Sequence, residues 1–450
     1  MSRSTQQHPP EAWAPVRRAA AALTSPIQRI LAVEAASGIG LLVATVVALI
    51  WANLWTASYA ELWHTPVGAH LGPWRYEQPL HFWVNDGLMT IFFFVVGLEI
   101  RREIFEGELA SVRKAALPLA AALGGMLAPA VIYAALNAGR DGAPGWAIPM
   151  ATDIAFAVGV LMLLGARVPS ALRVLLLALA VIDDIGAILV IAIFYSTGIS
   201  LQGLAVVGIG IAGVLTMRAA GVRTPLLYLG PGLLVWVGLL ITGIHPTIGG
   251  VLLGLLTPVR PWFGPSGFAA TTQAQLERIP EADRHALLLS LDRIEQARRE
   301  AVSPVERLIH ALHPWVAFVI MPIFALANAG VVLGGARLTD DYLWLFGGVV
   351  AGLAIGKPLG IAAASLGATK IKLAARSDEM TGRGILLVGL VGGIGFTMSL
   401  FIAQLAFPPG PLLDTAKLAI LVGSGAAILI GLVFGAATLR KQAADSSSLD

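Results

Sequence analysis

The segment LLLALAVIDDIGAILVIAI, residues 175–193, places two adjacent carboxylates, Asp183 and Asp184, in the middle of a run that is otherwise free of charge. A helix of about 20 apolar residues crosses the ~30 Å hydrocarbon core of a bilayer. Asp183 follows Arg173 by ten residues, which is about 15 Å along a helix, so it lies deep within such a span. An ionised aspartate at that depth costs roughly 2.5–3.5 kcal/mol on insertion scales. Neighbours could neutralise the acids to hold helices together, but two carboxylates favour a functional site.

The composition places the whole chain in a membrane. Of its 450 residues, 57% are apolar and 13% are charged, and the mean hydropathy is +0.79. Soluble domains carry about 25% charged residues, so we expect a polytopic membrane protein with the lipid bilayer as its surroundings and no nucleic-acid partner. The 50 glycines suit helices that pack closely. The absence of cysteine excludes disulfides, thiolate metal sites and cysteine catalysis.

The apolar runs predict an all-α fold with about twelve transmembrane helices. The expected spans cover residues 33–52, 80–100, 115–136, 146–165, 173–195, 201–217, two short spans within 225–257, then 314–332, 342–366, 384–406 and 413–439. Residues 53–79, rich in Trp, Tyr and His, predict a loop at the membrane interface.

The distribution of charge predicts the orientation of these spans. Basic residues cluster in the N-terminal tail and in alternate connections, at 101–114, 167–173, 218–223, 260–307, 370–383 and 440–441. The positive-inside rule therefore places those segments in the cytoplasm. The expected organisation is a cytoplasmic tail over 1–30, eight helices over 31–259, a cytoplasmic loop over 260–307, four helices over 308–439 and a cytoplasmic tail over 440–450.

The loop over 260–307 is polar and dense in charge, unlike its neighbours. Within it, residues 282–301 have helical periodicity, with Leu287, Leu291 and Ile294 on one face. We expect an amphipathic helix that rests on the membrane surface or on the protein.

Two expected spans contain features that interrupt a helix. Pro149 removes a backbone donor just before Thr152 and Asp153. In the segment VGLVGGIGFTMS, residues 388–399, repeated glycines weaken the helix at a similar depth. Either feature alone could be an ordinary kink, but interruptions in corresponding places of two halves favour a transporter with inverted repeats, spans 3–5 and 10–12. Each break would expose half-helix ends with partial charges, which Asp153 and Lys357 could offset.

Lys357 is the basic residue nearest the centre of any predicted span, so we expect it to pair with Asp153, Asp183 or Asp184. Adjacent residues on a helix point about 100° apart, so Asp183 and Asp184 cannot face the same way. Oxygen ligands without cysteine suit a hard cation, and close carboxylates also suit protons. The site could therefore hold either a metal ion or protons.

Other ionisable residues are candidates for pH sensing. His245 lies at the break between the two short spans, and His310 and His313 flank the start of the span over 314–332. Histidine titrates near neutral pH, although each could equally cap a helix. Glu99 and Glu103 lie at the end of the second span, where nearby arginines also allow a structural role.

Six motifs in order resemble the NhaA-type bacterial sodium/proton antiporters. They are NDGLMTIFFFVVGLEIRRE (85–103), GWAIPMATDIAFAVG (145–159), ALAVIDDIGAI (178–188), HPWVAFVIMPIFALANAG (313–330), GKPLGI (356–361) and GIGFTMS (393–399). The similarity extends from about Ala35 to the end of the last span, without the 260–304 insertion. It implies a secondary active transporter of the bacterial inner membrane that exports Na⁺ or Li⁺ in exchange for protons by alternating access, with two interrupted, crossing helices. It also implies roles in sodium and pH homeostasis, and no cofactor.

The resemblance also implies roles for individual residues. Asp184 would be the principal sodium or lithium ligand, and Asp183 a proton-carrying partner that forms a salt bridge with Lys357. Thr152 and Asp153 would belong to the crossed, unwound helix assembly. Further, His245 matches a position tied to the pH response, and Glu99 and Glu103 match a cluster in the cytoplasmic funnel.

The chain departs from the resemblance at Ile309, where the family has an acid just before the first histidine of this region. The pH-sensing cluster is therefore incomplete, and the pH profile cannot be transferred. The long first loop leaves room for a hairpin that forms a homodimer. One alternative is a sodium-coupled symporter with a similar pair of broken helices. The other is an intramembrane aspartyl protease, which needs two catalytic aspartates on separate helices. The central acids here are adjacent and no GxGD motif occurs, so the protease lacks support.

Overall fold

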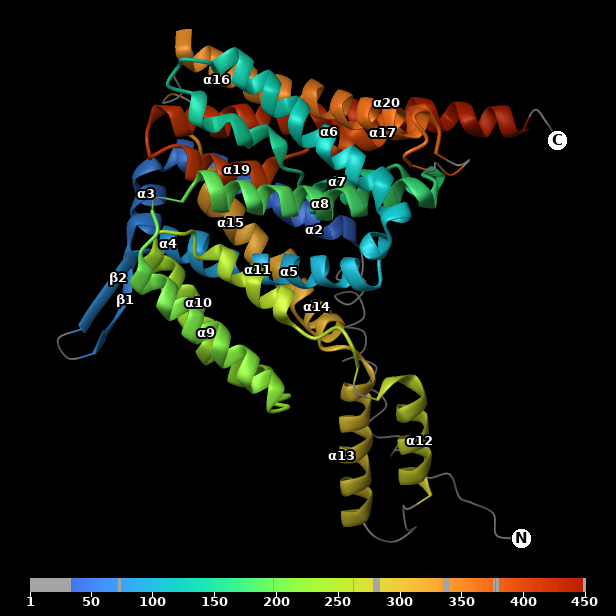
Figure 1. Cartoon of the computed structure of the whole chain (residues 1–450). Coiled ribbons are helices and arrows are strands. Elements are labelled where there is room, and N and C mark those ends of the chain that lie inside the picture. The colour runs from blue at the N-terminus through green and yellow to red at the C-terminus, as the bar shows by residue number, and fades with distance from the viewer. Residues whose placement is uncertain are drawn as a thin grey trace, which may run out of the picture.

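The computed structural model is a bundle of helices with one small hairpin of strands (Figure 1). It describes residues 34–71, 74–196, 198–261, 263–277, 284–332, 334, 340–374, 377 and 380–447. The tail predicted over 1–30 lies outside the described residues.

The helices confirm the all-α membrane fold. Within the described residues, nine helical segments are long and apolar enough to cross a membrane, and two bent pairs bring the number to eleven. The remaining expected span, α11 (Thr247–Leu256), has only ten residues. The unbroken helices are α2 (Glu34–Leu54), α6 (Val112–Asn137), α8 (Ser170–Phe194), α9 (Leu201–Ala219), α10 (Leu229–Thr242, preceded by a 3₁₀ turn at Pro225–Tyr228) and α20 (Pro411–Ser447).

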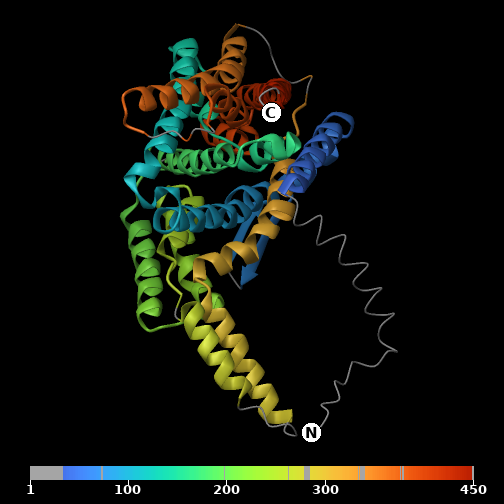
Figure 2. The ribbon, with the colours of Figure 1, turned by 90° about the vertical axis from the view of Figure 1, so that its right-hand side faces the viewer.

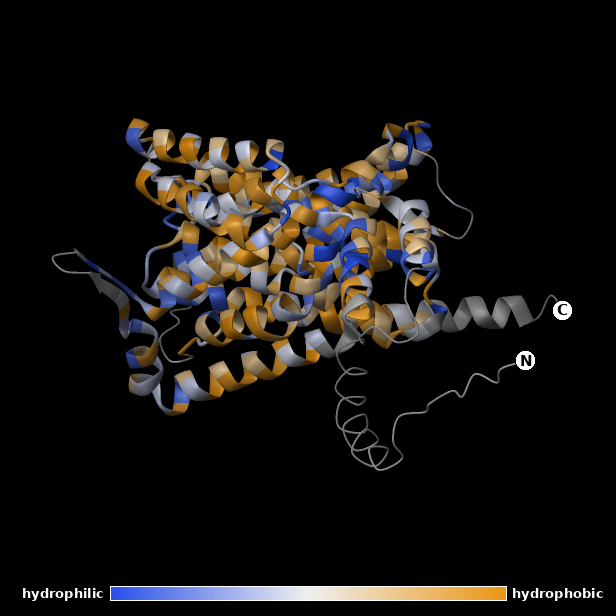
Figure 3. Cartoon of the chain, turned by 90° about the horizontal axis from the view of Figure 1, so that it is seen from below, coloured by the Kyte–Doolittle hydropathy of each residue, from blue (hydrophilic) through white to orange (hydrophobic). Residues whose placement is uncertain are grey.

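The surface of the bundle matches a lipid environment. On α6, Leu119, Leu123, Leu127 and Val131 are 45–64% exposed and recur every fourth residue, which places them on one face of the helix. The opposite face is buried against α8, α16 (Asp340–Ala351) and α17 (Lys357–Lys370). Hydrophobic residues predominate along most helices of the bundle (Figure 3). An exposed leucine stripe of this kind is stable in hydrocarbon.

Three spans contain a π-helical turn that the sequence pattern did not reveal. The second span runs through α4 (Leu80–Phe82), the π turn η2 (Trp83–Leu88) and α5 (Met89–Phe105). The ninth combines α14 (Pro304–Trp315), η7 (Val316–Ile320) and α15 (Met321–Asn328), and the tenth combines α16, η8 (Gly352–Gly356) and α17. Such turns often occur at functional sites, and η8 ends where Lys357 begins the next helix.

The two predicted interruptions are confirmed. The fourth span consists of the 3₁₀ helix η4 (Ala143–Met150) and α7 (Ile154–Leu163), which are bent by 41°. The eleventh consists of α18 (Gly382–Gly392) and α19 (Phe396–Ala406), bent by 49°. In each case the break falls at mid-span, as Pro149 and the glycines predicted.

Residues 53–79 differ from the expected loop. They contain the short helix α3 (Thr56–His64) and an antiparallel hairpin of β1 (Pro66–Leu71) and β2 (Trp74–Pro79), in register Pro66↔Pro79 to Leu71↔Trp74. Cross-strand pairing depends on the register of the two strands, which the Trp-rich composition alone did not specify. The hairpin projects from one end of the bundle (Figure 1).

The 260–307 insertion contains two helices where one was expected. α12 (Gly264–Leu276) packs against α13 (Arg284–Ala301), and the pair projects away from the bundle (Figures 1 and 2). Ala297 of α13 is buried, whereas Leu287 and Leu291 of its predicted apolar face are 38% and 49% exposed, so the expectation that this helix rests on the membrane surface stays a prediction. The ninth helix also begins earlier than predicted, at Pro304, because Ser303 accepts a hydrogen bond from the Glu306 amide and caps it.

Candidate functional site

The two broken spans cross at their unwound segments. The Asp153 amide donates to the Ile394 carbonyl at 2.6 Å, and the Thr152 hydroxyl donates to the Gly392 carbonyl at 3.0 Å. Thr152 and Asp153 are both buried. The backbone groups released by the breaks are therefore satisfied by the opposite break, as buried polar groups require.

Asp153 caps two half-helices at once. Its Oδ1 accepts from the Phe156 amide at 3.2 Å, at the start of α7, and its Oδ2 accepts from the Thr397 amide at 3.0 Å, at the start of α19. The Thr397 hydroxyl donates to the same Oδ2. Helix N-termini carry positive partial charge, so one buried carboxylate offsets both. Asp153 is thus placed where the sequence suggested that it could offset a half-helix charge, and that role stays a prediction.

Lys357 lies against a helix C-terminus, which carries negative partial charge. Its ammonium donates to the carbonyl of Met150, the last residue of η4, and lies 2.7 Å from Asp183 Oδ2. Both side chains are fully buried. Among the three partners that the sequence left open, the structure selects Asp183 as the ion-pair partner of Lys357.

Asp183 and Asp184 lie side by side on α8 but have different surroundings. Besides Lys357, Asp183 Oδ2 accepts from the Thr152 hydroxyl at 2.6 Å, whereas its Oδ1 is buried without a hydrogen-bond partner. Asp184 is 3% exposed, and among the described residues its carboxylate has no recorded hydrogen bond or ion pair. Buried carboxylate oxygens without donors are suited to bind a cation or a proton.

The described residues contain no group of three or more His, Asp or Glu side chains arranged to hold a metal ion. A cation at Asp183 and Asp184 would therefore share its coordination with hydroxyl, carbonyl or water oxygens.

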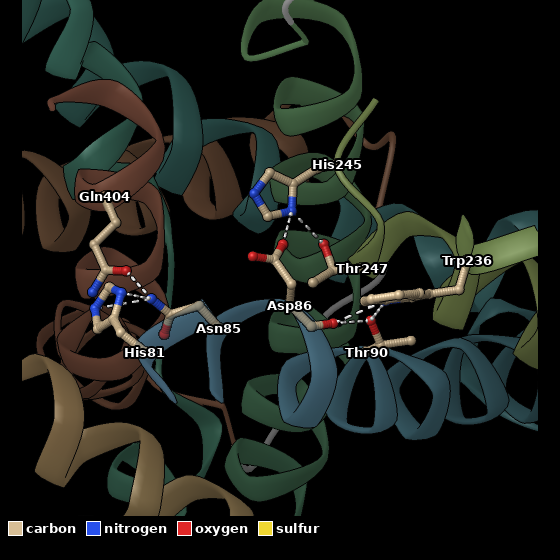
Figure 4. Close-up of polar contacts among 8 residues, drawn as sticks. All are labelled: His81, Asn85, Asp86, Thr90, Trp236, His245, Thr247 and Gln404. Carbon is tan, nitrogen blue, oxygen red and sulfur yellow. Dashed lines mark hydrogen bonds and ion pairs between the residues drawn. The ribbon is translucent and has the colours of Figure 1, made fainter. Parts of the chain in front are cut away.

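The predicted pH-sensing residues fall into separate contacts. His245 Nδ1 lies 3.4 Å from Asp86 Oδ1 and 3.2 Å from the Thr247 hydroxyl (Figure 4). Elsewhere, His313 Nδ1 lies 3.9 Å from Glu99 Oε1. Asp86 lies in η2 of the second span, and nothing in the sequence pattern indicated its contact with His245.

Glu103 and His310 do not join either contact. Glu103 lies 3.7 Å from Arg102 and accepts from the Glu108 amide at 3.1 Å, which is the structural role that nearby arginines allowed. His310 is exposed on α14. Ile309 does not line a polar mouth, because it is 8% exposed in an apolar cluster with Leu98 and Val305.

Sequence reasoning did not identify Thr397, which caps the crossing with Asp153, although it lies within the motif GIGFTMS. It also missed a network of His81, Asn85, Asn328 and Gln404, whose only signal was polar side chains within apolar spans. Polar residues in such positions usually face the interior of a bundle.

Two half-helix pairs that cross beside buried carboxylates and a buried lysine define a secondary transporter of the inverted-repeat type. The chain belongs to the Na⁺/H⁺ antiporter 1 family, whose family model matches residues 28–434.

Named relatives are similar over nearly the whole chain. A protein of Sorangium cellulosum named Na(+)/H(+) antiporter NhaA 2 is 58% identical over 96% of this chain and 94% of its own length. A Myxococcus xanthus protein of the same name is 54% identical, over 95% and 92%. The Na(+)/H(+) antiporter NhaA of Bordetella petrii is 49% identical, over 92% and 91%.

Proposed function

We propose that the protein exchanges Na⁺ for protons across the membrane, and that Asp183 and Asp184 bind both ions. The observation that carries this proposal is the buried Asp184 carboxylate, which has no recorded partner among the described residues and adjoins the Asp183–Lys357 pair. The family and the names of the relatives support antiport. Li⁺ is a hard monovalent cation and should use the same oxygens.

Asp183 and Asp184 have different roles in this proposal. Asp184 would supply charge to the bound cation, while Asp183 would release or take a proton as its contact with Lys357 changes. A proton on Asp183 removes the charge that holds Lys357, so proton binding and the geometry of the broken helices are linked. Alternating access would then expose the same site to each side in turn. No cofactor is needed for this exchange.

The remaining roles are part of the same proposal. Thr152, Asp153 and Lys357 would hold the crossing in place. The pH response would be tuned by the contacts of His245, Glu99 and His313. Glu103 and the exposed His310 would take part in the same response. The basic connections support cytoplasmic termini in a bacterial inner membrane. The projecting β1–β2 hairpin offers strand edges that a second copy could extend, forming a homodimer.

The test is dequenching of a pH-sensitive dye in everted vesicles on addition of Na⁺, Li⁺ or K⁺. Wild-type protein should move protons out of the vesicle lumen as Na⁺ enters. Asp184→Asn should lower the rate roughly 100-fold or more, because the cation loses a charged ligand. Asp141→Asn, at an exposed carboxylate outside the site, is the matched control and should behave as wild type.

A sodium-coupled symporter would take up Na⁺ without a counterflow of protons, so addition of Na⁺ would not dequench the dye. Near-normal exchange by a well-folded Asp184→Asn protein would reject the proposed site, even if the wild type is an antiporter.

A further inference from the structure

A partly buried network of four polar side chains lies at the end of the bundle that carries the β1–β2 hairpin, with Asn85 and Asn328 buried and His81 and Gln404 half-buried. Asn85 Nδ2 donates to Gln404 Oε1 at 2.5 Å, and Asn328 Nδ2 donates to Asn85 Oδ1 at 2.8 Å. The Gln404 amide donates to Asn328 Oδ1, which also lies 2.9 Å from His81 Nε2. We call these four residues the amide network; Figure 4 shows its His81, Asn85 and Gln404 corner.

His81 connects two of the amides in this network. With Nε2 protonated it donates to Asn328 Oδ1 at 2.9 Å, and Asn85 Nδ2 lies 3.2 Å from its Nδ1 and 3.1 Å from its Nε2. The second hydrogen of the Asn328 amide goes to the Phe324 carbonyl at 2.9 Å. The ion-binding site uses none of these groups. A satisfied polar network in an apolar bundle specifies one arrangement of its helices.

Gln404 shares one face of α19 with Phe401, because residues three apart on a helix are neighbours. Phe401 is 1% exposed, and its ring centroid lies 5.3 Å from Phe93, 6.2 Å from Phe324 and 5.5 Å from His245. This face of α19 therefore makes a dry aromatic contact next to the amide network. Apolar constrictions of this kind block hydrated ions.

The amide network joins two groups of helices. The first turn of α19 contains Thr397, which Asp153 holds in the crossing, and α19 packs on η4 and α20. Asn85 and Asn328 belong to η2 and α15, which pack on each other, and α15 also packs on α2. The helix that completes the ion site is thus the helix that carries Phe401 and Gln404.

We propose that Phe401 and Gln404 form a latch that closes the ion route toward the hairpin end of the bundle, and that this latch must separate from Asn85 and Asn328 in each exchange cycle. The inference rests on the proposed exchange by alternating access. It adds the boundary along which the helices part, between α19 on one side and η2 with α15 on the other.

The chain contains no cysteine, so cysteine pairs can be placed without background. Asn85→Cys with Gln404→Cys spans the proposed boundary, whereas Asn85→Cys with Asn328→Cys lies on one side of it and is the matched control. Each full-length double variant is reconstituted in liposomes and treated with a short, reductively cleavable bis-thiosulfonate. The fraction linked is measured by mass spectrometry, and Na⁺-driven proton movement is measured before linking, after linking and after reduction.

The latch predicts at least a tenfold loss of exchange when the 85–404 pair is linked, recovery after reduction, and less than a twofold change when the 85–328 pair is linked. Full linking of 85–404 with unchanged exchange would overturn the proposal. Equal losses in both pairs would also overturn it, because the boundary would not follow α19.

A second pair keeps the test decisive if Asn85→Cys prevents folding. Asn328→Cys with Gln404→Cys crosses the same boundary and leaves Asn85 intact, so linking it should also block exchange. Wild-type protein distinguishes the two proposals: no Na⁺-driven proton movement would reject the proposed function, whereas normal wild-type exchange with a harmless 85–404 link would reject only the latch.

Discussion

At the scale of single residues, the Asp183–Lys357 pair places two opposite charges in the interior of the bundle. Two opposite charges are fully buried 2.7 Å apart, where desolvation offsets much of their attraction. The Met150 carbonyl and the Thr152 hydroxyl supply the further hydrogen bonds that such a pair needs. The pair is therefore a poor source of stability but a strict constraint on where η4, α8 and α17 meet.

Removing one charge of the Asp183–Lys357 pair should destabilise the protein more than removing both charges. Lys357→Met leaves Asp183 buried without its counter-charge and should destabilise the protein by about 3–5 kcal/mol. Adding Asp183→Leu should recover most of that loss, although exchange stays absent because a proposed ligand is gone. Thermal unfolding of purified protein in detergent measures both variants, and a double variant less stable than Lys357→Met would contradict this account.

At the scale of helices, α6 and α17 approach each other through glycine. A Cβ on Gly360 would lie 2.1 Å from the Gly124 carbonyl oxygen, and one on Gly124 would lie 2.2 Å from the Gly360 carbonyl oxygen. Both obstacles are backbone atoms, which cannot rotate away. Small residues at such spacing let membrane helices pack closely, and this crossing positions Lys357, three residues before Gly360.

Gly360→Ala should push α17 away from α6 and lower both thermal stability and exchange, with a cost of roughly 1–3 kcal/mol for an overpacked contact. Gly367→Ala is a control on the same helix, because a Cβ there meets nothing within 4 Å. That control should be neutral or stabilise the helix by up to about 1 kcal/mol. Equal melting temperatures for the two variants would show that the crossing tolerates a wider spacing.

At the scale of the whole molecule, the α12–α13 pair is attached to the bundle mainly through its base. Arg223 pairs with the Glu300 carboxylate, and the Arg307 guanidinium of α14 donates to the Arg299 carbonyl at 2.8 Å. The rest of the pair projects from the bundle (Figure 2). This arrangement separates the insertion from the crossing where the ion site lies.

Replacement of residues 267–296 with a short glycine–serine linker should therefore leave exchange within about twofold of wild type, since no residue of the site or of the amide network is removed and Glu300 remains. Reconstituted protein and the dye assay test this expectation, with expression level as the control for folding. Complete loss of exchange in a well-folded deletion would assign the insertion a direct role.

The whole transport cycle should show competition between Na⁺ and protons. If both ions use Asp183 and Asp184, Na⁺ binds only after the pair has released protons, so the apparent KM for Na⁺ should rise as the pH falls. The titration belongs to the coupled pair, with Lys357 included, rather than to one residue. High Na⁺ should then restore most of the rate at acidic pH.

A grid of initial rates over pH and Na⁺ concentration in liposomes measures this competition. A KM that stays constant while the maximal rate falls would favour a separate gate over a shared site.

The sequence by itself determined the membrane class, the spans and the two breaks, because hydropathy, Pro149 and the glycine run act locally. It also located the central acids and the need for a partner to Lys357, since the cost of a buried charge does not depend on the fold. It could not choose among Asp153, Asp183 and Asp184, because the choice depends on how the segments of Asp153 and of the adjacent Asp183 and Asp184 pack against Lys357.

Tertiary structure alone decided the contacts between distant segments. Asp153 meets Thr397, a residue 244 positions away, and Gln404 meets Asn85 across 319 positions. It also decided the strand register of the hairpin, the π turns before Met89 and Lys357, and the burial of Ile309 in an apolar cluster. Each of these depends on which helix lies alongside, and hydrophobic periodicity states only that a face is buried, not which helix covers it.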